Sequence, residues 1–181
     1  MRNEIRTKRL LLKVVDPSET DQVLDYVVRN KIFLREWEPQ RTEEYYTYPF
    51  QKKSLEEDFE KNQKGSLRKF WLFLGNRIIG SAALSNIIRG AFQSCYLGYG
   101  IDEQEQGKGL MTEVIEAVVA HAFQELKLHR IEANIMPRNQ ASLRVVEKLG
   151  FVNEGISRDY LKINGKWEDH IHMVLINEDM E

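Results

Sequence analysis

Short apolar runs of strand length alternate along this chain with longer stretches in which apolar residues recur at helical spacing. The strand-length runs occupy residues 9–15, 70–74, 78–84, 95–101 and 130–136. Helical spacing follows Ser18, recurs in 54–62 and 110–126, and appears once more in an amphipathic stretch that stops at Gly150. Because these two spacings indicate strands and helices, the order predicts a mixed α/β sheet with helices inserted between strands.

Two turns in the sequence predict β-hairpins. The glycine-containing turn at residues 75–77 joins two of the apolar runs. Asn164-Gly165 joins the last two extended stretches, residues 155–163 and 166–176, and this dipeptide supplies the two positive φ angles of a type I′ turn. The chain is therefore expected to end in a hairpin.

The turn between the runs 95–101 and 110–126 is the most informative stretch. A strand leads there through glycines into a helix N-terminus, so several backbone N–H groups and the positive end of the helix dipole meet at one point. This arrangement predicts a pyrophosphate site. A P-loop would need glycine in place of Asp102, and a dinucleotide fingerprint would need glycine or alanine in place of Glu103 or Thr112. Both of those motifs are excluded.

The turn does fit the pattern Gln-x-x-Gly-x-Gly, through Gln104, Gly107 and Gly109. It resembles the signature of the GNAT acetyltransferases, and the resemblance implies that this turn holds the pyrophosphate of acetyl-CoA. A second block agrees with the same superfamily. There the run 130–136 leads into an Asn-bearing loop at 137–142 and then into a short helix that stops at Leu-Gly-Phe.

Further motifs narrow the resemblance to the RimJ/RimL branch, the ribosomal-protein N-terminal acetyltransferases, with the strongest similarity to the RimJ type. The motifs lie at residues 97–101, 106–111, 136–139, 159–161, 164–167 and 169–170. Upstream of Phe70 the similarity is weaker and rests mainly on residues 34–39. The resemblance implies one domain over residues 1–181 with the GNAT acyl-CoA N-acyltransferase fold, a largely antiparallel twisted sheet flanked by helices.

The same resemblance implies how acetyl-CoA binds. The strand before the turn would pair its backbone with the pantetheine arm, which assigns the arm to Leu97, Gly98, Tyr99, Gly100 and Ile101. The pyrophosphate is assigned to Gln106, Gly107, Lys108, Gly109 and Leu110, with two glycines because a Cβ would obstruct the phosphate. Asn139 is expected to bind the amide-rich arm through its side chain. Lys108 either adds positive charge or is a solvated turn lysine.

Two catalytic residues follow from the resemblance. Many superfamily members carry a proton-donating tyrosine seven residues after the loop Asn, but Val146 stands there. The RimL type carries a serine three residues after that Asn, so Ser142 is expected to hydrogen-bond the CoA sulfur as it gains charge. Asp159, just before Tyr160, matches the position of an acid and is the candidate base, although the RimL type has the longer glutamate. Alternatively, Ser142 is an ordinary residue of a first helical turn and Asp159 a surface carboxylate.

The stretch at residues 32–50 is aromatic and irregular and predicts no regular element. Its acids and aromatic rings are candidates for a wall around a cationic acceptor, and we assign Glu36 and Trp37, together with Tyr160, to substrate binding. The alternative is that the acids are solvated loop charges and the aromatic rings are core.

The acceptor is expected to be an N-terminal α-amine. At pH 7 roughly a tenth or more of such amines are neutral, against well under a thousandth of lysine side chains, so an α-amine needs little help from a base. The resemblance implies a protein, plausibly ribosomal, with N-terminal Ala or Ser. A small amine such as a polyamine, an amino sugar or an antibiotic is the alternative, and a non-catalytic acyl-CoA-binding module is the third hypothesis.

Composition limits the other classes of function. The net charge of −2 is made of interspersed charges of both signs, which gives no basic stripe for nucleic acid. The single cysteine, Cys95, excludes an internal disulfide and is expected to pack in its strand. His170 and His172 share a strand face but lack a visible third ligand, so no metal is predicted. With no apolar run of membrane-spanning length, we expect a cytoplasmic protein without membrane partners, and we leave a homodimer open.

Overall fold

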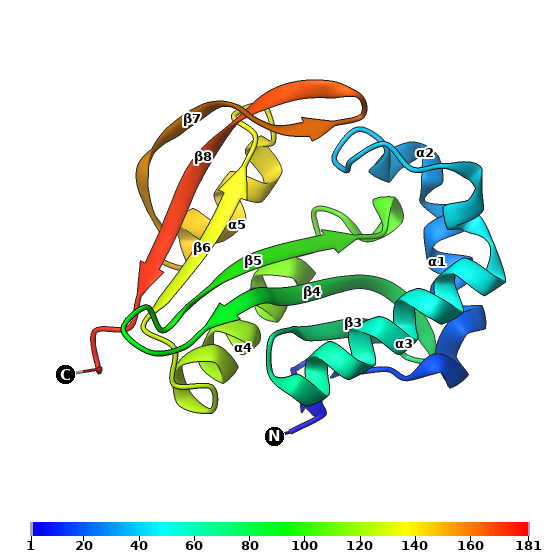
Figure 1. Cartoon of the computed structure of the whole chain (residues 1–181), viewed down its shortest axis with the longest axis horizontal. Helices are drawn as coiled ribbons and strands as arrows, with labels where there is room; N and C mark the ends of the chain where they lie inside the picture. The colour runs from blue at the N-terminus through cyan, green and yellow to red at the C-terminus, as the bar shows by residue number, and fades with distance from the viewer. Residues whose placement is uncertain (1, 181) are drawn as a thin grey trace.

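The computed structural model describes residues 2–180, and in this part of the chain eight strands form one twisted sheet (Figure 1). The strands are β1 Glu4–Arg6, β2 Leu11–Lys13, β3 Arg68–Leu74, β4 Arg77–Ile88, β5 Ser94–Ile101, β6 Arg130–Ile135, β7 Val152–Ile163 and β8 Lys166–Ile176. Their order in the sheet is β1-β2-β3-β4-β5-β6-β8-β7. All neighbours are antiparallel except β5 and β6, which confirms the predicted mixed, largely antiparallel sheet.

Helices cover both faces of this sheet (Figure 1). They are α1 Thr20–Arg29, α2 Lys31–Leu34, α3 Tyr48–Lys64, α4 Leu110–Gln124 and α5 Gln140–Lys148, with short 3-10 helices η1 Pro17–Glu19, η2 Glu43–Tyr46 and η3 Glu103–Glu105. One apolar core lies between the sheet and α4 and α5, and a second lies between the sheet and α1 and α3. Among the described helices, none is both long and apolar enough to cross a bilayer.

Strand β3 explains why its sequence reads as an unbroken apolar run. Phe70 and Leu72 belong to the core under α4 and α5, whereas Trp71 and Phe73 belong to the core under α1 and α3. Successive side chains of a strand point to opposite faces, so a strand covered on both faces needs apolar residues at every position. Cys95 on β5 is also buried, as predicted, and burial raises the pKa of its thiol to about 12.

Several predicted elements needed correction. The stretch at residues 32–50 is irregular only in part. Residues 35–42 form no helix or strand, but the stretch also contains α2, η2 and the start of α3, which is longer than the predicted 54–62. The strand predicted at residues 9–15 is shorter, and β1 was missed because Ile5 is its one apolar residue. Asp16 is the N-cap of η1, which leads into α1, and its side chain accepts the Ser18 N–H at 2.8 Å.

Both predicted hairpins are present. Gly75 has φ +63° in the turn between β3 and β4. Asn164 and Gly165, with φ +45° and +82°, form the turn between β7 and β8 and confirm the positive-φ pair. Strand β7 is one edge of the sheet, and its pairing with β8 is irregular at two places. Asp159, with φ +49°, lies in the second of them. Such irregularities blunt an edge strand against pairing with another chain.

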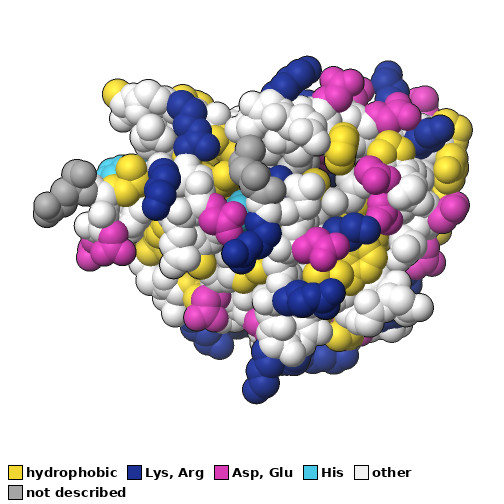
Figure 2. All heavy atoms as spheres, turned by 90° about the horizontal axis from the view of Figure 1, so that it is seen from below, with side chains coloured by type: hydrophobic (Ala, Val, Ile, Leu, Met, Phe, Trp, Pro, Cys, Tyr) yellow, Lys and Arg dark blue, Asp and Glu magenta, His cyan; other side chains and the backbone are white. Residues whose placement is uncertain are grey.

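Figure 2 shows the charges on one face of the molecule, seen from below relative to the view of Figure 1. Basic and acidic side chains are interspersed there and lie among smaller apolar areas. This mixture agrees with the near balance of Lys and Arg against Asp and Glu in the sequence.

Gly80 on β4 provides a test of this packing. A Cβ at Gly80 would lie 2.4 Å from the carbonyl oxygen of Gly100 on β5, so we expect Gly80→Ala to lower the free energy of unfolding by about 1–3 kcal/mol. Gly98→Ala is the matched control, because a Cβ there meets nothing within 4 Å. Urea denaturation measures both variants. Equal midpoints for the two variants would contradict the close approach of β4 and β5.

Candidate active site

The site begins where β5 and β6 separate. These two parallel strands are paired only where residues 94–96 face residues 130–132, although β5 continues to Ile101 and β6 to Ile135. Figure 1 shows the strands diverging from there toward the side of α2. The edge of β5 from Leu97 to Ile101, the segment predicted to bind the pantetheine arm, is therefore not paired with β6 and can accept an extended ligand as an additional strand.

The two sides of this opening differ in chemistry because side chains alternate along each strand. Leu97 and Tyr99 of β5, like Ala133 of β6, pack against the core under α4 and α5. The intervening residues face the other side. On β5 these are Tyr96, Gly98 and Gly100, and on β6 they are Arg130, Glu132 and Asn134.

The predicted pyrophosphate cradle lies at the end of β5. Gly107 and Gly109 have φ +71° and +73°, a left-handed conformation that favours glycine. Gly109 is the N-cap of α4, and no side chain caps this helix, so the N–H groups of its first turn remain available to an anion. The space where Gly107 would carry a Cβ is open. Leu110 points into the core, so only its backbone can serve a ligand. The cradle therefore fits a diphosphate.

An ion pair from the N-terminal segment holds this loop in place. Arg9 donates to the carbonyl oxygen of Lys108 at 2.8 Å and pairs with Glu113 of α4 at 2.7 Å. Burial opposes ionisation of Glu113, but hydrogen bonds from Thr7 and Arg9 outweigh it and hold the pKa of this carboxyl below its usual range. Sequence reasoning missed Arg9 because about a hundred residues separate it from the loop that it binds.

Lys108 has a partner that sequence reasoning did not foresee. Its ammonium lies 2.8 Å from Glu105, and the same carboxylate pairs with Arg77 of β4 at 2.9 Å. Glu105 is buried, so two cations compensate one carboxylate at the base of the cradle. A phosphate contact by Lys108 stays a prediction.

Ser142 lies on α5 against β5. Its hydroxyl donates to the Tyr99 hydroxyl at 2.7 Å, and the Tyr99 hydroxyl donates to the Ser142 carbonyl at 3.1 Å. Burial raises the pKa of Tyr99 to about 12, so the phenol keeps its proton at neutral pH. Val146, which stands where many relatives carry tyrosine, is fully buried in the core. Tyr99 thus places a phenol beside Ser142 from β5, a contact that the sequence did not indicate.

Asn139 occupies the N-cap of α5. Its side-chain oxygen accepts the N–H of Ser142 at 3.1 Å, which leaves the amide nitrogen as the donor for a cofactor. The structure brings Asn139, Ser142 and Tyr99 together on the side of the opening that faces α5.

The two residues predicted on β7 have different surroundings. Asp159 is exposed, and its backbone N–H donates to Asp169 at 3.0 Å. Tyr160 packs against the rings of His170 and His172, and its hydroxyl accepts a hydrogen bond from Asn134 of β6 at 3.4 Å. Tyr160 therefore reaches the opening, whereas the role of Asp159 as a base stays a prediction.

Glu36 and Trp37, the predicted acceptor-binding pair, both contact Arg138 in the loop after β6. Arg138 lies 2.7 Å from the Glu36 carboxylate, and its guanidinium lies over the Trp37 ring at 4.9 Å. A weaker contact, at 3.5 Å, links Arg138 to Glu168 of β8. Arg138 thus joins the segment after α2 to the strands that line the opening, and sequence reasoning missed it.

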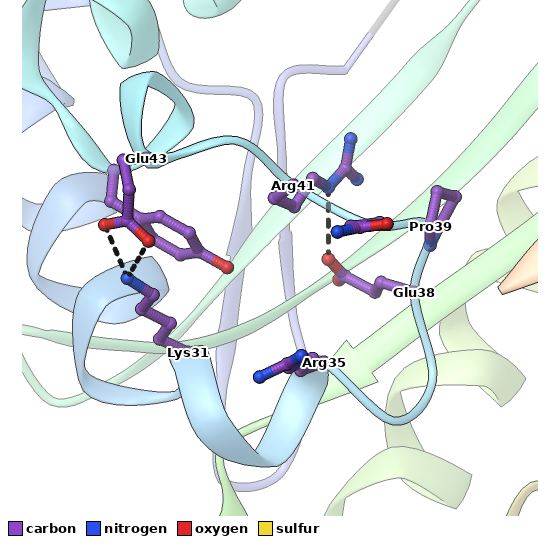
Figure 3. Close-up of a pocket in the computed structure, with 8 residues that line it drawn as sticks. Lys31, Arg35, Glu38, Pro39, Arg41 and Glu43 are labelled. Atoms are coloured by element: carbon purple, nitrogen blue, oxygen red, sulfur yellow. Dashed lines mark hydrogen bonds and ion pairs between the residues drawn. The ribbon is translucent and has the colours of Figure 1, made fainter. Parts of the chain in front are cut away.

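A small cavity of about 180 Å³ lies beside α2 (Figure 3). Its lining is Lys31, Arg35, Glu38, Pro39, Gln40, Arg41, Glu43 and Tyr46. Most of its charges are matched internally, because Lys31 pairs with Glu43 at 2.7 Å and Arg41 with Glu38 at 3.5 Å. Burial raises the pKa of Glu38, and its carbonyl accepts the N–H of Asn164 at 2.9 Å. The cavity belongs to the contact between this segment and the hairpin tip, not to the cradle.

We also searched the described residues for side chains that could bind a metal ion. Within residues 2–180, no three His, Cys, Asp or Glu side chains come together as they would around a metal ion. His170 and His172 instead contact Tyr160, and the proposals below require no metal.

Comparison with known proteins agrees with this geometry. Residues 9–152 match the family model described as an acetyltransferase (GNAT) domain. The chain is 41% identical over 179 residues to the probable N-acetyltransferase YjcK of Bacillus subtilis (strain 168), covering 98% of this chain and 99% of that protein. It is 39% identical over 179 residues to the [ribosomal protein uS5]-alanine N-acetyltransferase of Escherichia coli (strain K12), covering 97% of this chain and 91% of that protein.

A solved structure shows the same architecture. The ribosomal-protein-S5-alanine acetyltransferase of Vibrio fischeri superposes with a TM-score of 0.94 at 34% identity, covering 98% of each chain. The predicted resemblance to the RimJ/RimL branch is thereby confirmed. This chain belongs to the GNAT family and is an N-acetyltransferase.

Proposed function

We propose that this enzyme transfers the acetyl group of acetyl-CoA to the N-terminal α-amine of a protein, in particular a ribosomal protein that begins with Ala or Ser. The observation that carries the proposal is the opening between β5 and β6, which ends at an uncapped helix N-terminus shaped for a diphosphate. The substrate class rests on the relatives, whose names specify ribosomal-protein alanine. We treat residues 1–181 as one domain acting in the cytoplasm. The proposal needs no nucleic acid, membrane or metal ion, and it suits a monomer or a homodimer.

The reaction makes two chemical demands, one at the attacking amine and one at the leaving thiolate. The amine nitrogen must be neutral to attack the thioester carbon, and the leaving thiolate must be stabilised or protonated. An α-amine meets the first condition in roughly a tenth or more of molecules at pH 7. For the second condition, the Ser142 hydroxyl and the Tyr99 phenol form a hydrogen-bonded pair on the side of the opening that faces α5.

The acceptor class can be tested with peptides. A peptide with a free N-terminal Ala or Ser should gain one acetyl group, whereas the same peptide with a blocked N-terminus and an internal lysine should not. Mass spectrometry locates the acetyl group, and released CoA thiol gives the rate. A parallel panel of polyamines, amino sugars and aminoglycosides tests the small-amine alternative. Modification of lysine alone, or of small amines alone, would refute the proposal.

Removal of either hydroxyl at the thiolate end tests the second step. We expect Tyr99→Phe and Ser142→Ala to lower kcat roughly a hundredfold or more with little change in acetyl-CoA binding, because a positioned proton donor typically contributes that much. Tyr48→Phe, an exposed tyrosine on α3, is the control for loss of a phenol elsewhere. Steady-state kinetics and calorimetry measure both quantities. If both variants keep the wild-type kcat, the two hydroxyls have no part in the reaction.

A further inference from the structure

Three side chains from three adjacent strands form a hydrogen-bonded row on the side of the opening opposite α5. The Ser157 hydroxyl of β7 lies 2.7 Å from Nε2 of His172 on β8, and Nδ1 of His172 lies 3.0 Å from the Glu132 carboxylate on β6. The side chains of His172 and Glu132 keep 21% and 17% of their surface exposed, so the row is sheltered but can be reached by a substrate.

Glu132 determines which nitrogen of His172 accepts a proton. Burial opposes ionisation of Glu132, but hydrogen bonds from Arg130, His172 and Asn134 outweigh it and hold its pKa below the usual range. An ionised carboxylate only accepts hydrogen bonds, so Nδ1 must carry the hydrogen. Nε2 is then the lone-pair acceptor and faces the hydroxyl of Ser157.

The row of Ser157, His172 and Glu132 lies next to the point where β5 and β6 separate. Glu132 is in the last pair that β6 makes with β5, and Asn134, two residues further on, is paired in register with His172. On the facing strand, Gly98 carries no side chain, and the position where its Cβ would lie is open. No side chain of Gly98 therefore occupies the side of β5 that Asn134 and His172 share.

Asn134 has an unused acceptor at the same place. Its amide nitrogen donates to the Tyr160 hydroxyl, but its side-chain oxygen is buried and has no hydrogen-bond partner among the described residues. A buried carbonyl oxygen without a partner is costly, and an incoming N–H would satisfy it. The Tyr160 ring, 5.1 Å from the His172 ring, covers the row from one side.

We propose that His172 is the proton acceptor for the amine, acting through Ser157 and oriented by Glu132, and that the Asn134 oxygen receives an N–H of the acceptor. The inference rests on the proposed function and deepens it by naming the group that deprotonates the acceptor. Glu132 is a positioning residue, because it acts through the imidazole. The row takes the place that the sequence motif gives to Asp159.

The protons balance as follows. The ammonium N–H bond breaks, its proton passes to the Ser157 oxygen, and the Ser157 hydroxyl proton moves to Nε2 of His172. The neutral amine then forms the C–N bond with the acetyl carbon as the C–S bond breaks. Of the two protons that the ammonium loses, one reaches water from His172. The other leaves as the amide forms, replacing the proton that Ser142 and Tyr99 supply to the CoA sulfur.

Several ionisable groups surround His172. They are Arg130 and Glu132 on β6, Glu154 and Tyr160 on β7, and His170 on β8. Arg130 pairs with both Glu132 and Glu154, at 3.1 Å and 2.7 Å, so one cation lies between the two carboxylates nearest the imidazole.

The test compares His172→Gln with wild type on an Ala-initiated peptide over a range of pH. At pH 7 we expect kcat/KM to fall roughly a hundredfold, because glutamine keeps hydrogen bonds but cannot take a proton. Near pH 9.5, above the pKa of about 7.7 to 8.0 of the α-amine, the loss should shrink to a few-fold, because the acceptor is already neutral. His129→Gln, at an exposed histidine before β6, is the matched control and should match wild type.

Further variants and measurements distinguish a loss of proton transfer from a loss of cofactor binding or of stability. Glu132→Gln should lower kcat/KM at pH 7, because an amide can donate to Nδ1 and no longer fixes the hydrogen on that nitrogen, and Glu132→Asp should restore part of the loss. Acetyl-CoA affinity by calorimetry and the melting temperature should stay at wild-type values for His172→Gln.

Two results would overturn the inference without touching the proposed function. One is a His172→Gln enzyme with a wild-type profile on the peptide. The other is a loss at pH 7 that appears in Asp159→Asn and is absent in His172→Gln. Failure of the wild-type enzyme to acetylate any N-terminal peptide would instead refute the proposed function itself.

Discussion

The separation of β5 from β6 is the constraint on which the rest of the structure depends. Backbone N–H and C=O groups in a protein need partners, and a sheet normally supplies them along its whole length. Here the two central parallel strands pair at three residues each and then diverge, which leaves the edge of β5 unpaired with β6 in the middle of the sheet rather than at its margin. The amides of a pantetheine arm are of the kind that can hydrogen-bond such an edge. The loop after β5 leads through η3 to the N-terminus of α4, so the proposed diphosphate site would follow directly on the proposed arm site.

The alternation of side chains along β5 and β6 gives the opening two chemically separate sides. Ser142 and Tyr99 lie on the side that faces α5, where burial keeps the phenol protonated. The row of Ser157, His172 and Glu132 lies on the other side. If the proposed roles hold, the pleat of the two strands places the donor for the thiolate and the acceptor for the amine on different sides of the opening.

Local signals in the sequence predicted what local geometry determines. The glycines of the cradle and the Asn164-Gly165 turn need positive φ, so the residue type itself reveals the conformation. Contacts between distant segments left no such signal. Arg9 with Glu113, Arg138 with Glu36, and His172 with Glu132 join residues that no periodicity relates. The insertion of β8 between β6 and β7 brings Ser157, His172 and Glu132 into one row, and spacing alone reveals only that His170 and His172 share a face. Short edge strands such as β1 were not predicted for a different reason, because a single apolar residue gives no hydrophobic periodicity.

Val146 leaves α5 without the phenol that many superfamily members are expected to carry there. In a helix such as α5, the residue four positions after Ser142 lies on the same face, and here that residue is buried valine in the core. A phenol at this place would need a buried partner or would cost stability. The structure instead presents the phenol of Tyr99 from β5, with its hydroxyl satisfied by Ser142 on both its donor and acceptor sides. Because β5 also borders the proposed cofactor edge, Tyr99 places a phenol beside the opening while α5 keeps an apolar core face.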